Sequence, residues 1–133
     1  MIRNKKAERR QYPRIEQVLP LKVAANGYDF ATSTLNVSCL GAYCHIDKYM
    51  PPFTKVMVRL ALPVSTLNGN KNYNVECKGV VVRSEDESRG GFNIAIYFNE
   101  IGGSQRHKIS QYINQFLPKV PLVLKEYGRP RPR

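Results

Sequence analysis

The sequence predicts a mainly β protein in which six antiparallel strands form a barrel or a sandwich, followed by one α-helix. Six segments with alternating or β-branched side chains fall within about 85 residues, and no helical pattern separates them. Turn-forming residues divide the segments, and the apolar spacing then changes to the three- and four-residue spacing of a helix. A barrel would remove the exposed strand edges that an open sheet carries.

Three strands are expected in the first half of the chain. Apolar side chains alternate with polar or small ones in the first segment, and Asn26-Gly27 strongly indicates a two-residue hairpin turn after it. The second segment is rich in β-branched and aromatic residues, and Gly41 separates it from the third. The three expected strands cover residues 19–24, 28–37 and 42–46.

Three more strands are expected in the second half, after a break at Met50-Pro51-Pro52. Pro63 is expected to end the fourth strand, because proline has no backbone N–H for a ladder hydrogen bond. Gly79 indicates a bulge or a close contact within the fifth strand, and an acidic turn at residues 85–91 precedes the sixth. These three strands cover residues 56–62, 73–83 and 92–98.

A helix is expected after Gly102-Gly103. Ser104 is a suitable N-cap, and Pro118 is expected to end the helix. Between them, apolar side chains recur at the spacing of one helical face, namely at Ile109, Tyr112, Ile113, Phe116 and Leu117. This single apolar face predicts that the helix packs on the barrel or on a partner, and packing on the barrel core is the favoured interpretation.

Basic residues concentrate at the two ends of the chain. Residues 1–14 carry six Lys or Arg and one Glu, and residues 119–133 carry five and one. Residues 15–118, the predicted barrel and helix, carry ten basic and eight acidic side chains. The chain is therefore expected to have a basic N-terminal arm, a nearly neutral domain and a basic, partly disordered tail. The basic ends predict an anionic partner.

Nothing in the spacing of reactive residues indicates an enzyme or a metal site. His45 and His107 have no recognisably spaced nucleophile. The cysteines, Cys39, Cys44 and Cys77, are odd in number and form no C-x-x-C, which favours reduced, partly buried thiols. Without an apolar run of about 20 residues or a secretory signal, the sequence predicts a cytoplasmic protein with no membrane span.

The first of two binding motifs is Arg10-Gln11-Tyr12-Pro13-Arg14, which Arg9 precedes. Pro13 disfavours the helical conformation for Tyr12, so the arginines are expected along an extended loop. Guanidinium groups bind phosphate through two hydrogen bonds and recognise the edge of guanine. This segment is therefore a candidate anion-binding loop that could wrap around a ligand.

The second motif is the segment Asn36-Val37-Ser38-Cys39-Leu40-Gly41. Asn36 and Ser38 lie two residues apart at the end of a predicted strand, so their side chains are expected on one face. An amide and a hydroxyl provide donors and acceptors for a base edge or a phosphate. Gly41 is expected to permit a sharp turn.

Together the two motifs resemble the PilZ domain family, whose pattern is R-x-x-x-R in an N-terminal loop and [D/N]-x-S-x-x-G on the barrel wall. Arg10 and Arg14 match the first part, and Asn36, Ser38 and Gly41 match the second. The resemblance covers roughly residues 8–117. It implies a six-stranded antiparallel split barrel with a C-terminal helix, and no cofactor. It also implies that the ligand is cyclic di-GMP, a bacterial second messenger.

The resemblance implies specific contacts with that ligand. The arginines would contact its phosphates and guanines, the Asn and Ser side chains would hold a guanine edge or a phosphate, and the glycine would shape the turn. Closure of the arm over the ligand would change the surface presented to a downstream protein partner. The implied ligand-binding residues are Arg9, Arg10, Arg14, Asn36, Ser38 and Gly41.

Two alternatives remain open at this point. A small nucleic-acid-binding barrel could use Tyr12, Tyr28 and Tyr43 as stacking groups, although the nearly neutral body argues against a basic groove. A PilZ-like adaptor that binds no ligand could act through protein contacts, although the intact motifs argue against it.

Overall fold

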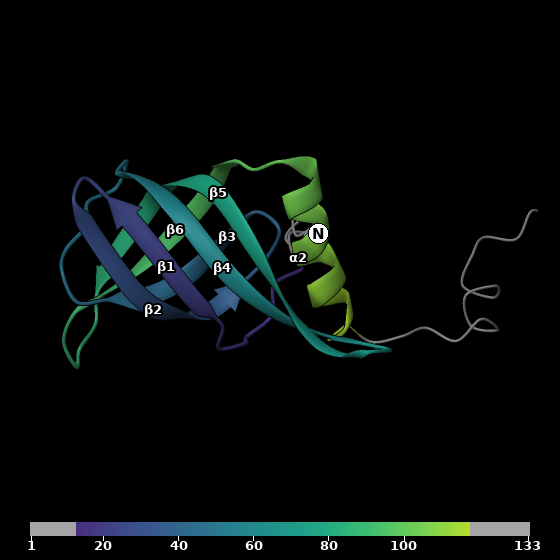
Figure 1. Ribbon diagram of the computed structural model, residues 1–133. Helices are drawn as coiled ribbons and strands as arrows, with labels where there is room; N and C mark the ends of the chain where they lie inside the picture. Colours follow the sequence, from purple (N-terminus) through teal and green to yellow (C-terminus); the bar gives the residue numbers. More distant parts are fainter. Residues whose placement is uncertain (1–12, 118–133) are drawn as a thin grey trace, which may run out of the picture.

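The computed structural model describes residues 13–117, which form a closed six-stranded barrel with a helix at one end (Figure 1). Every strand is antiparallel to both neighbours, in the order β1-β2-β3-β6-β5-β4 around the ring. The predicted mainly β architecture is confirmed, as a barrel. Its elements are β1 (Pro20–Ala25), β2 (Tyr28–Val37), β3 (Gly41–Ile46), β4 (Lys55–Thr66), β5 (Gly69–Asp86), β6 (Phe92–Glu100) and α2 (Gly103–Asn114).

The β1–β2 hairpin forms as its sequence predicts. Asn26 and Gly27 both have positive φ, 45° and 88°, which is the requirement of a type I′ turn. Ala25 pairs directly with Tyr28 across this turn. The two-residue turn therefore sets the register of the first two strands.

The β4–β5 hairpin is longer than the sequence predicts, and the prediction that Pro63 ends β4 is wrong. β4 continues to Thr66, and Pro63 pairs with Asn72 of β5. β1 pairs with β4 no further than Leu60. Among the described strands, residues 61–66 of β4 therefore pair only with β5. Proline is tolerated on such an edge. The hairpin therefore extends past the body of the barrel beside α2 (Figure 1).

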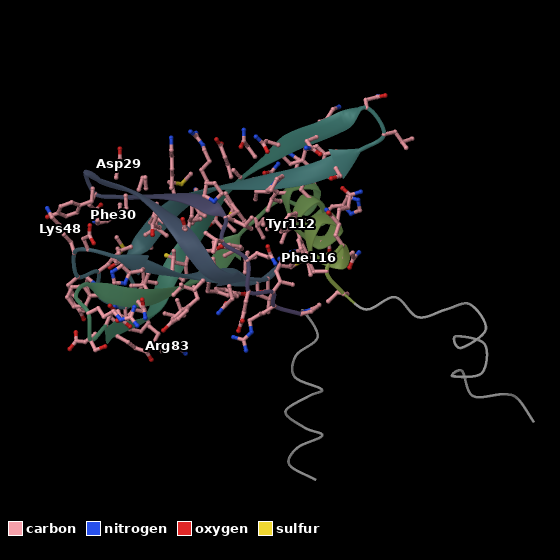
Figure 2. The ribbon with its side chains drawn as sticks, turned by 90° about the horizontal axis from the view of Figure 1, so that it is seen from below. Asp29, Phe30, Lys48, Arg83, Tyr112 and Phe116 are labelled. Carbon is pink, nitrogen blue, oxygen red and sulfur yellow. The ribbon has the colours of Figure 1, made fainter. Side chains whose placement is uncertain are left out.

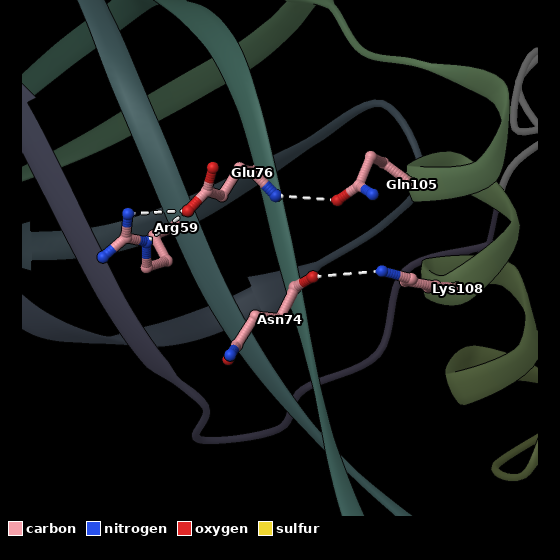
Figure 3. Close-up of polar contacts among 5 residues, drawn as sticks. All are labelled: Arg59, Asn74, Glu76, Gln105 and Lys108. Atoms are coloured by element: carbon pink, nitrogen blue, oxygen red, sulfur yellow. Dashed lines mark hydrogen bonds and ion pairs between the residues drawn. The ribbon is translucent and has the colours of Figure 1, made fainter.

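Helix α2 covers an otherwise open edge of β5. β5 pairs with β6 from Lys78 onward, so its earlier half lacks a partner on that side. Gln105 Oε1 accepts a hydrogen bond from Glu76 N at 2.8 Å, and Lys108 Nζ donates to Asn74 O at 3.3 Å (Figure 3). These side chains satisfy backbone groups that could otherwise pair with another strand.

The helix starts and ends earlier than expected. Its N-cap is Gly102 rather than Ser104, with no side-chain cap, and the helix ends at Asn114, before Pro118. The predicted apolar face is buried at Ile109, Tyr112 and Ile113. Phe116 lies beyond the last helical turn and is 44% exposed, although its ring lies 5.1 Å from that of Tyr112 (Figure 2).

The cysteines are free thiols, with Cys44 on β3, Cys77 on β5 and Cys39 in the loop between β2 and β3. All three are buried. Burial raises the pKa of Cys44 to about 12 and that of Cys77 to about 11, because the charged thiolate is poorly solvated in an apolar interior.

Candidate functional site

The structure describes four of the six predicted ligand-binding residues. Arg14 is exposed, Asn36 is half-buried at the end of β2, and Ser38 is buried just beyond that strand. Gly41 is the first residue of β3. The remaining two, Arg9 and Arg10, lie outside the described residues.

A short β-bridge brings the two motifs together. Ile15 and Val37 exchange both backbone hydrogen bonds, each at 3.0 Å, in antiparallel orientation. Arg14 precedes one bridge residue and Ser38 follows the other, so the antiparallel direction places them side by side. The extended segment that carries Arg14 is thus held against the end of β2.

A buried threonine strengthens this attachment. Thr34 Oγ1 accepts a hydrogen bond from Leu19 N at 3.0 Å and donates one to Gln17 O at 2.5 Å. Thr34 N also donates to Leu19 O at 2.9 Å. Thr34 is fully buried, and these bonds satisfy both its hydroxyl and the neighbouring backbone. The segment leading to β1 is therefore fixed along β2 at two points.

Asn36 faces outward because β2 contains a β-bulge. The register with β3 shifts between Thr34 and Asn36, and Asn36 then pairs directly with Tyr43. Paired residues project from the same face of a sheet. Tyr43 lies between the buried residues Ala42 and Cys44, so both it and Asn36 project from the outside of the barrel.

Ser38 and Gly41 shape the loop between β2 and β3. Ser38 N donates to Gly41 O at 2.9 Å, and Ser38 Oγ accepts from Leu40 N at 3.0 Å. Ser38 Oγ therefore acts as an acceptor in this bond, and a hydroxyl also has one hydrogen that it can donate.

Position 41 requires glycine for a different reason from the sharp turn that the sequence predicts. A Cβ atom there would lie 2.1 Å from the carbonyl oxygen of Ile96, and the φ angle of Gly41 is not in the left-handed region. The close approach of β3 to β6 therefore requires this glycine.

The same loop contacts helix α2 through Cys39. Its Sγ lies 3.5 Å from Ser110 Oγ and donates to Arg106 O at 3.9 Å. A displacement of the loop by a ligand would therefore reach the helix directly.

A further group of side chains lies on the outer face of β3 and β5, where no sequence motif predicts one. Tyr43 Oη donates to Glu85 Oε1 at 2.8 Å, and Glu85 Oε2 forms an ion pair with Arg83 Nε at 3.2 Å. The Arg83 guanidinium lies 5.7 Å from the centroid of the Tyr43 ring. The hydrogen bond to Glu85, followed by burial, raises the pKa of Tyr43. No sequence motif links residues about forty positions apart, so strand pairing alone reveals this group.

Two hollows lie over β1, β4 and β5, and the first also reaches the start of β2 and the second the end of β6. They have volumes of about 370 and 400 Å³ and share Ala24 and Met57. Their linings mix basic with acidic side chains: Lys22, Asp29, Arg59 and Glu76 in the first, and Lys55, Lys78 and Glu100 in the second. Neither hollow therefore forms a continuous basic groove.

Within residues 13–117, no group of three His, Cys, Asp or Glu side chains is arranged to hold a metal ion. None of the helices in that part of the chain is long and apolar enough to cross a membrane.

Comparisons with known proteins agree with this architecture. The family model described as the PilZ domain matches residues 8–115, a range that includes all six predicted ligand-binding residues. The structure of the Bacillus subtilis inhibitor of motility (MotI/DgrA) matches with a TM-score of 0.70 at 18% identity, covering 80% of this chain. This chain spans 50% of that protein's length. No curated protein matches the sequence. At this identity the structural match shows a shared fold.

Proposed function

The chain belongs to the PilZ domain family, and from this premise we propose that it is a receptor for cyclic di-GMP that signals through a partner protein. PilZ domains form a family of cyclic di-GMP receptors and are binding domains rather than enzymes. The proposal concerns this particular chain: that it binds the ligand with the named residues and passes the signal on by contact.

The bridge between Ile15 and Val37 is the observation that carries the proposal. It places the exposed guanidinium-bearing Arg14 beside Ser38 and next to the outward-facing Asn36. An arginine, an amide and a hydroxyl at one surface can bind a phosphate and the edge of a guanine at the same time. We assign Arg10 to the same ligand on the strength of the family motif, and Arg9 because it directly precedes that motif.

Signalling would follow from ordering of the arm. A basic arm that closes over an anionic ligand loses conformational entropy, and charge-assisted hydrogen bonds from arginine offset that loss. A ligand that displaces the Ser38 loop would also move helix α2 through Cys39. The altered surface would then favour or disfavour a partner protein. The cytoplasm is the location proposed for this exchange.

The strongest alternative function is nucleic-acid binding. Tyr28 stacks with Phe30 and lies under Lys48, and Tyr43 is hydrogen-bonded to Glu85. Both rings therefore already have partners, and the two hollows mix charges of both signs. These observations favour a small anionic ligand over a nucleic-acid strand.

Isothermal titration calorimetry with cyclic di-GMP tests the proposal. We expect micromolar or tighter binding by the wild-type protein, and at least tenfold weaker binding by Arg10→Ala and by Arg14→Ala, since each loses charge-assisted hydrogen bonds. Arg89→Ala is the matched control, because Arg89 is exposed in the β5–β6 turn and its removal changes the net charge equally.

Two results would overturn the proposal. Absence of binding by the wild-type protein excludes the receptor function and leaves the ligand-free adaptor. Binding to oligonucleotides that weakens steeply with salt, with no response to cyclic di-GMP, supports the nucleic-acid alternative instead.

A further inference from the structure

We propose that the end of the barrel away from α2 is a docking surface for the basic C-terminal tail, residues 118–133, of a second copy of this chain. The surface, here called the distal end, comprises the β1–β2, β3–β4 and β5–β6 connections with the residues beside them, namely residues 25–30, 46–54 and 84–93. None of the six predicted ligand-binding residues lies there, so the inference stands independently of cyclic di-GMP binding.

The distal end is one continuous surface. Because each strand is antiparallel to both neighbours, β1, β3 and β5 all run towards it, and their three connections meet there. Lys48 Nζ in the β3–β4 connection lies 5.0 Å from the centre of the Tyr28 ring, beside the β1–β2 turn. Tyr49 in the same connection packs its ring 5.3 Å from that of Phe92, beside the β5–β6 turn. Figure 2 shows Lys48 at this end of the barrel and Tyr112 of α2 towards the other end.

The distal end is acidic, although the chain has a net charge of +11. Its three segments carry five of the eight Asp and Glu residues in the described part of the chain, but two basic residues, Lys48 and Arg89. Three of the five carboxylates are exposed and form no hydrogen bond or ion pair with another described residue: Asp29, Asp47 and Asp86. The other two have partners within the fold. The three free carboxylates favour a cationic partner and disfavour a nucleic acid or an anionic membrane.

The distal end also holds the most exposed aromatic side chain of the described residues, in a strained backbone conformation. Phe53 is 85% exposed and has a φ of 75°, which bulky residues rarely adopt. Thr54 N donates to Pro51 O at 3.2 Å, so Phe53 occupies the third position of a type II turn, where glycine is preferred. The hydrogen bond from Phe53 N to Val81 O, at 2.6 Å, fixes this turn against β5. Strain at an exposed ring points to a binding role, because the ring contributes little to the core.

Two further rings extend the apolar part of this surface, since Tyr28 and Tyr49 are both exposed. Tyr28 stacks on the half-buried Phe30, with ring centroids 6.0 Å apart. Tyr49 packs against Phe92, which is also half-buried. Rings that are already held in place lose little entropy when a partner binds. The distal end therefore suits a segment that carries both cationic and apolar side chains.

The C-terminal tail has this composition, and the proposed function does not use it. Residues 118–133 carry five Lys or Arg and one Glu, and they include the apolar run Val120-Pro121-Leu122-Val123-Leu124. The tail follows α2, which carries two Lys or Arg residues and no Asp or Glu. Acidic and basic regions therefore lie at opposite ends of the fold. This arrangement favours a head-to-tail contact, with the tail of one copy on the distal end of the next.

The reach of the tail favours a second copy over the same copy. β2 runs away from the distal end for ten residues, about 30 Å at 3.3 Å per residue, and the loop that follows it contacts α2 (Figure 1). The middle of the apolar run, Leu122, lies five residues after Leu117, the last described residue. An extended chain of that length covers at most about 18 Å. The apolar run therefore cannot reach the distal end of its own copy.

Sedimentation velocity of the full chain over a series of protein concentrations, at low and at high salt, tests this inference. We expect the wild type to self-associate reversibly, and about tenfold more weakly at high salt, because salt screens exposed charges. Phe53→Asn should raise the Kd of self-association about tenfold, as for loss of an aromatic anchor. It should not lower the melting temperature, since Asn accepts a positive φ. The matched control, Leu67→Asn, removes an exposed apolar side chain from the β4–β5 turn and should associate like the wild type.

A mixing experiment identifies the tail as the occupant of the distal end. The double variant Leu122→Ser/Leu124→Ser keeps the charge of the tail and removes two apolar side chains, so its self-association should weaken as in Phe53→Asn. An equimolar mixture of the two variants should form a heterodimer, because one supplies an intact tail and the other an intact distal end. The heterodimer should not grow further, since its remaining tail and its remaining distal end are both altered.

Several outcomes would overturn the inference. One is a wild type that stays monomeric at every concentration, and another is equal weakening of self-association in Phe53→Asn and Leu67→Asn. A lower melting temperature in Phe53→Asn would assign the ring to the stability of the fold and remove the argument from strain. Failure of the two variants to combine on mixing would exclude the tail as the occupant. Cosedimentation with phosphatidylserine vesicles that is lost in Phe53→Asn would assign the distal end to a membrane instead.

Discussion

Two faces of the barrel carry an arginine–glutamate pair with equal exposure of the arginine, but they differ in the surroundings of that pair. On the face formed by β2, β3, β6 and β5, here called the motif face, Arg83 stacks on Tyr43, which pairs with Asn36. On the face formed by β1, β4 and β5, here called the opposite face, Arg59 crosses to Glu76 beside an open hollow.

An isolated surface ion pair contributes about 0–1 kcal/mol to stability. The difference between the faces therefore lies in organisation and not in the strength of one pair. The motif face has two β-bulges, a glycine at a close strand contact and an attached extended segment. The opposite face follows regular alternation, with an unbroken register between β4 and β5. The irregular strand pairing therefore occurs on the face that is proposed to bind cyclic di-GMP.

Gly41→Ala should have the largest effect on the motif face. The new methyl group would meet the Ile96 carbonyl at 2.1 Å, so β3 and β6 must separate, at a cost of about 3 kcal/mol in the free energy of unfolding. Urea unfolding measures this change.

The matched control is Gly103→Ala in the first turn of α2, where a Cβ meets nothing within 4 Å. It should leave stability nearly unchanged or slightly raised. Equal stability of Gly41→Ala and the wild type would show that the two strands can move apart freely.

Thr34→Val should have the next largest effect, through the attachment of the segment that carries Arg14. Leu19 N would lose an acceptor and Gln17 O a donor, which costs about 2 kcal/mol when such groups are buried. Cyclic di-GMP binding should weaken as well, since Arg14 is held by this segment.

Thr32→Val is the control on the same strand. Thr32 Oγ1 makes one hydrogen bond, to His45 O at 2.5 Å, so a smaller loss of stability and no loss of affinity are expected. The attachment would be unimportant if both variants bound the ligand equally well.

The interior behind the two faces should respond differently to alkaline pH. Cys44 lies behind the motif face with a pKa of about 12, and Cys77 behind the opposite face with a pKa of about 11, both above the usual 9.0. An unfolded chain releases these protons at lower pH than the folded barrel does. Stability is therefore retained below pH 9.0 and falls as the pH rises towards the folded values.

The expected slope is up to about 1.4 kcal/mol per pH unit for each thiol. Urea unfolding across alkaline pH measures it in the wild type, Cys44→Ala and Cys77→Ala. All other ionisable groups are the same in the three proteins, so differences between the three slopes isolate the thiols. We expect Cys44→Ala and Cys77→Ala each to have a shallower slope than the wild type above pH 9.0, and a slope that is unchanged in both variants would contradict the assignment to these thiols.

Several elements were predictable because local chemistry decides them. Asn26-Gly27 requires a tight hairpin wherever it lies between two strands, since both residues accept positive φ. Residues 28–37 are rich in β-branched and aromatic side chains, which favour a strand, and they form β2 with these bounds. The prediction for Pro63 was wrong because the missing N–H of proline matters only where a neighbouring strand would accept a hydrogen bond from it, and β1 does not extend that far. The N-cap of α2 was also predicted wrongly, at Ser104, because the actual N-cap residue, Gly102, has no side chain that could indicate it.

By itself, the sequence determined the number and order of the strands, the helix that follows them, and the two motifs that indicate a cyclic di-GMP site. Alternation, turn residues and motif spacing are local properties, so a linear reading detects them. The tertiary structure alone decided which face each polar residue occupies. Asn36 and Arg83 point outward because a one-residue register shift exchanges the two faces of a strand. Such a shift depends on the partner strand, and for Arg83 the residues that reveal it lie far away along the chain.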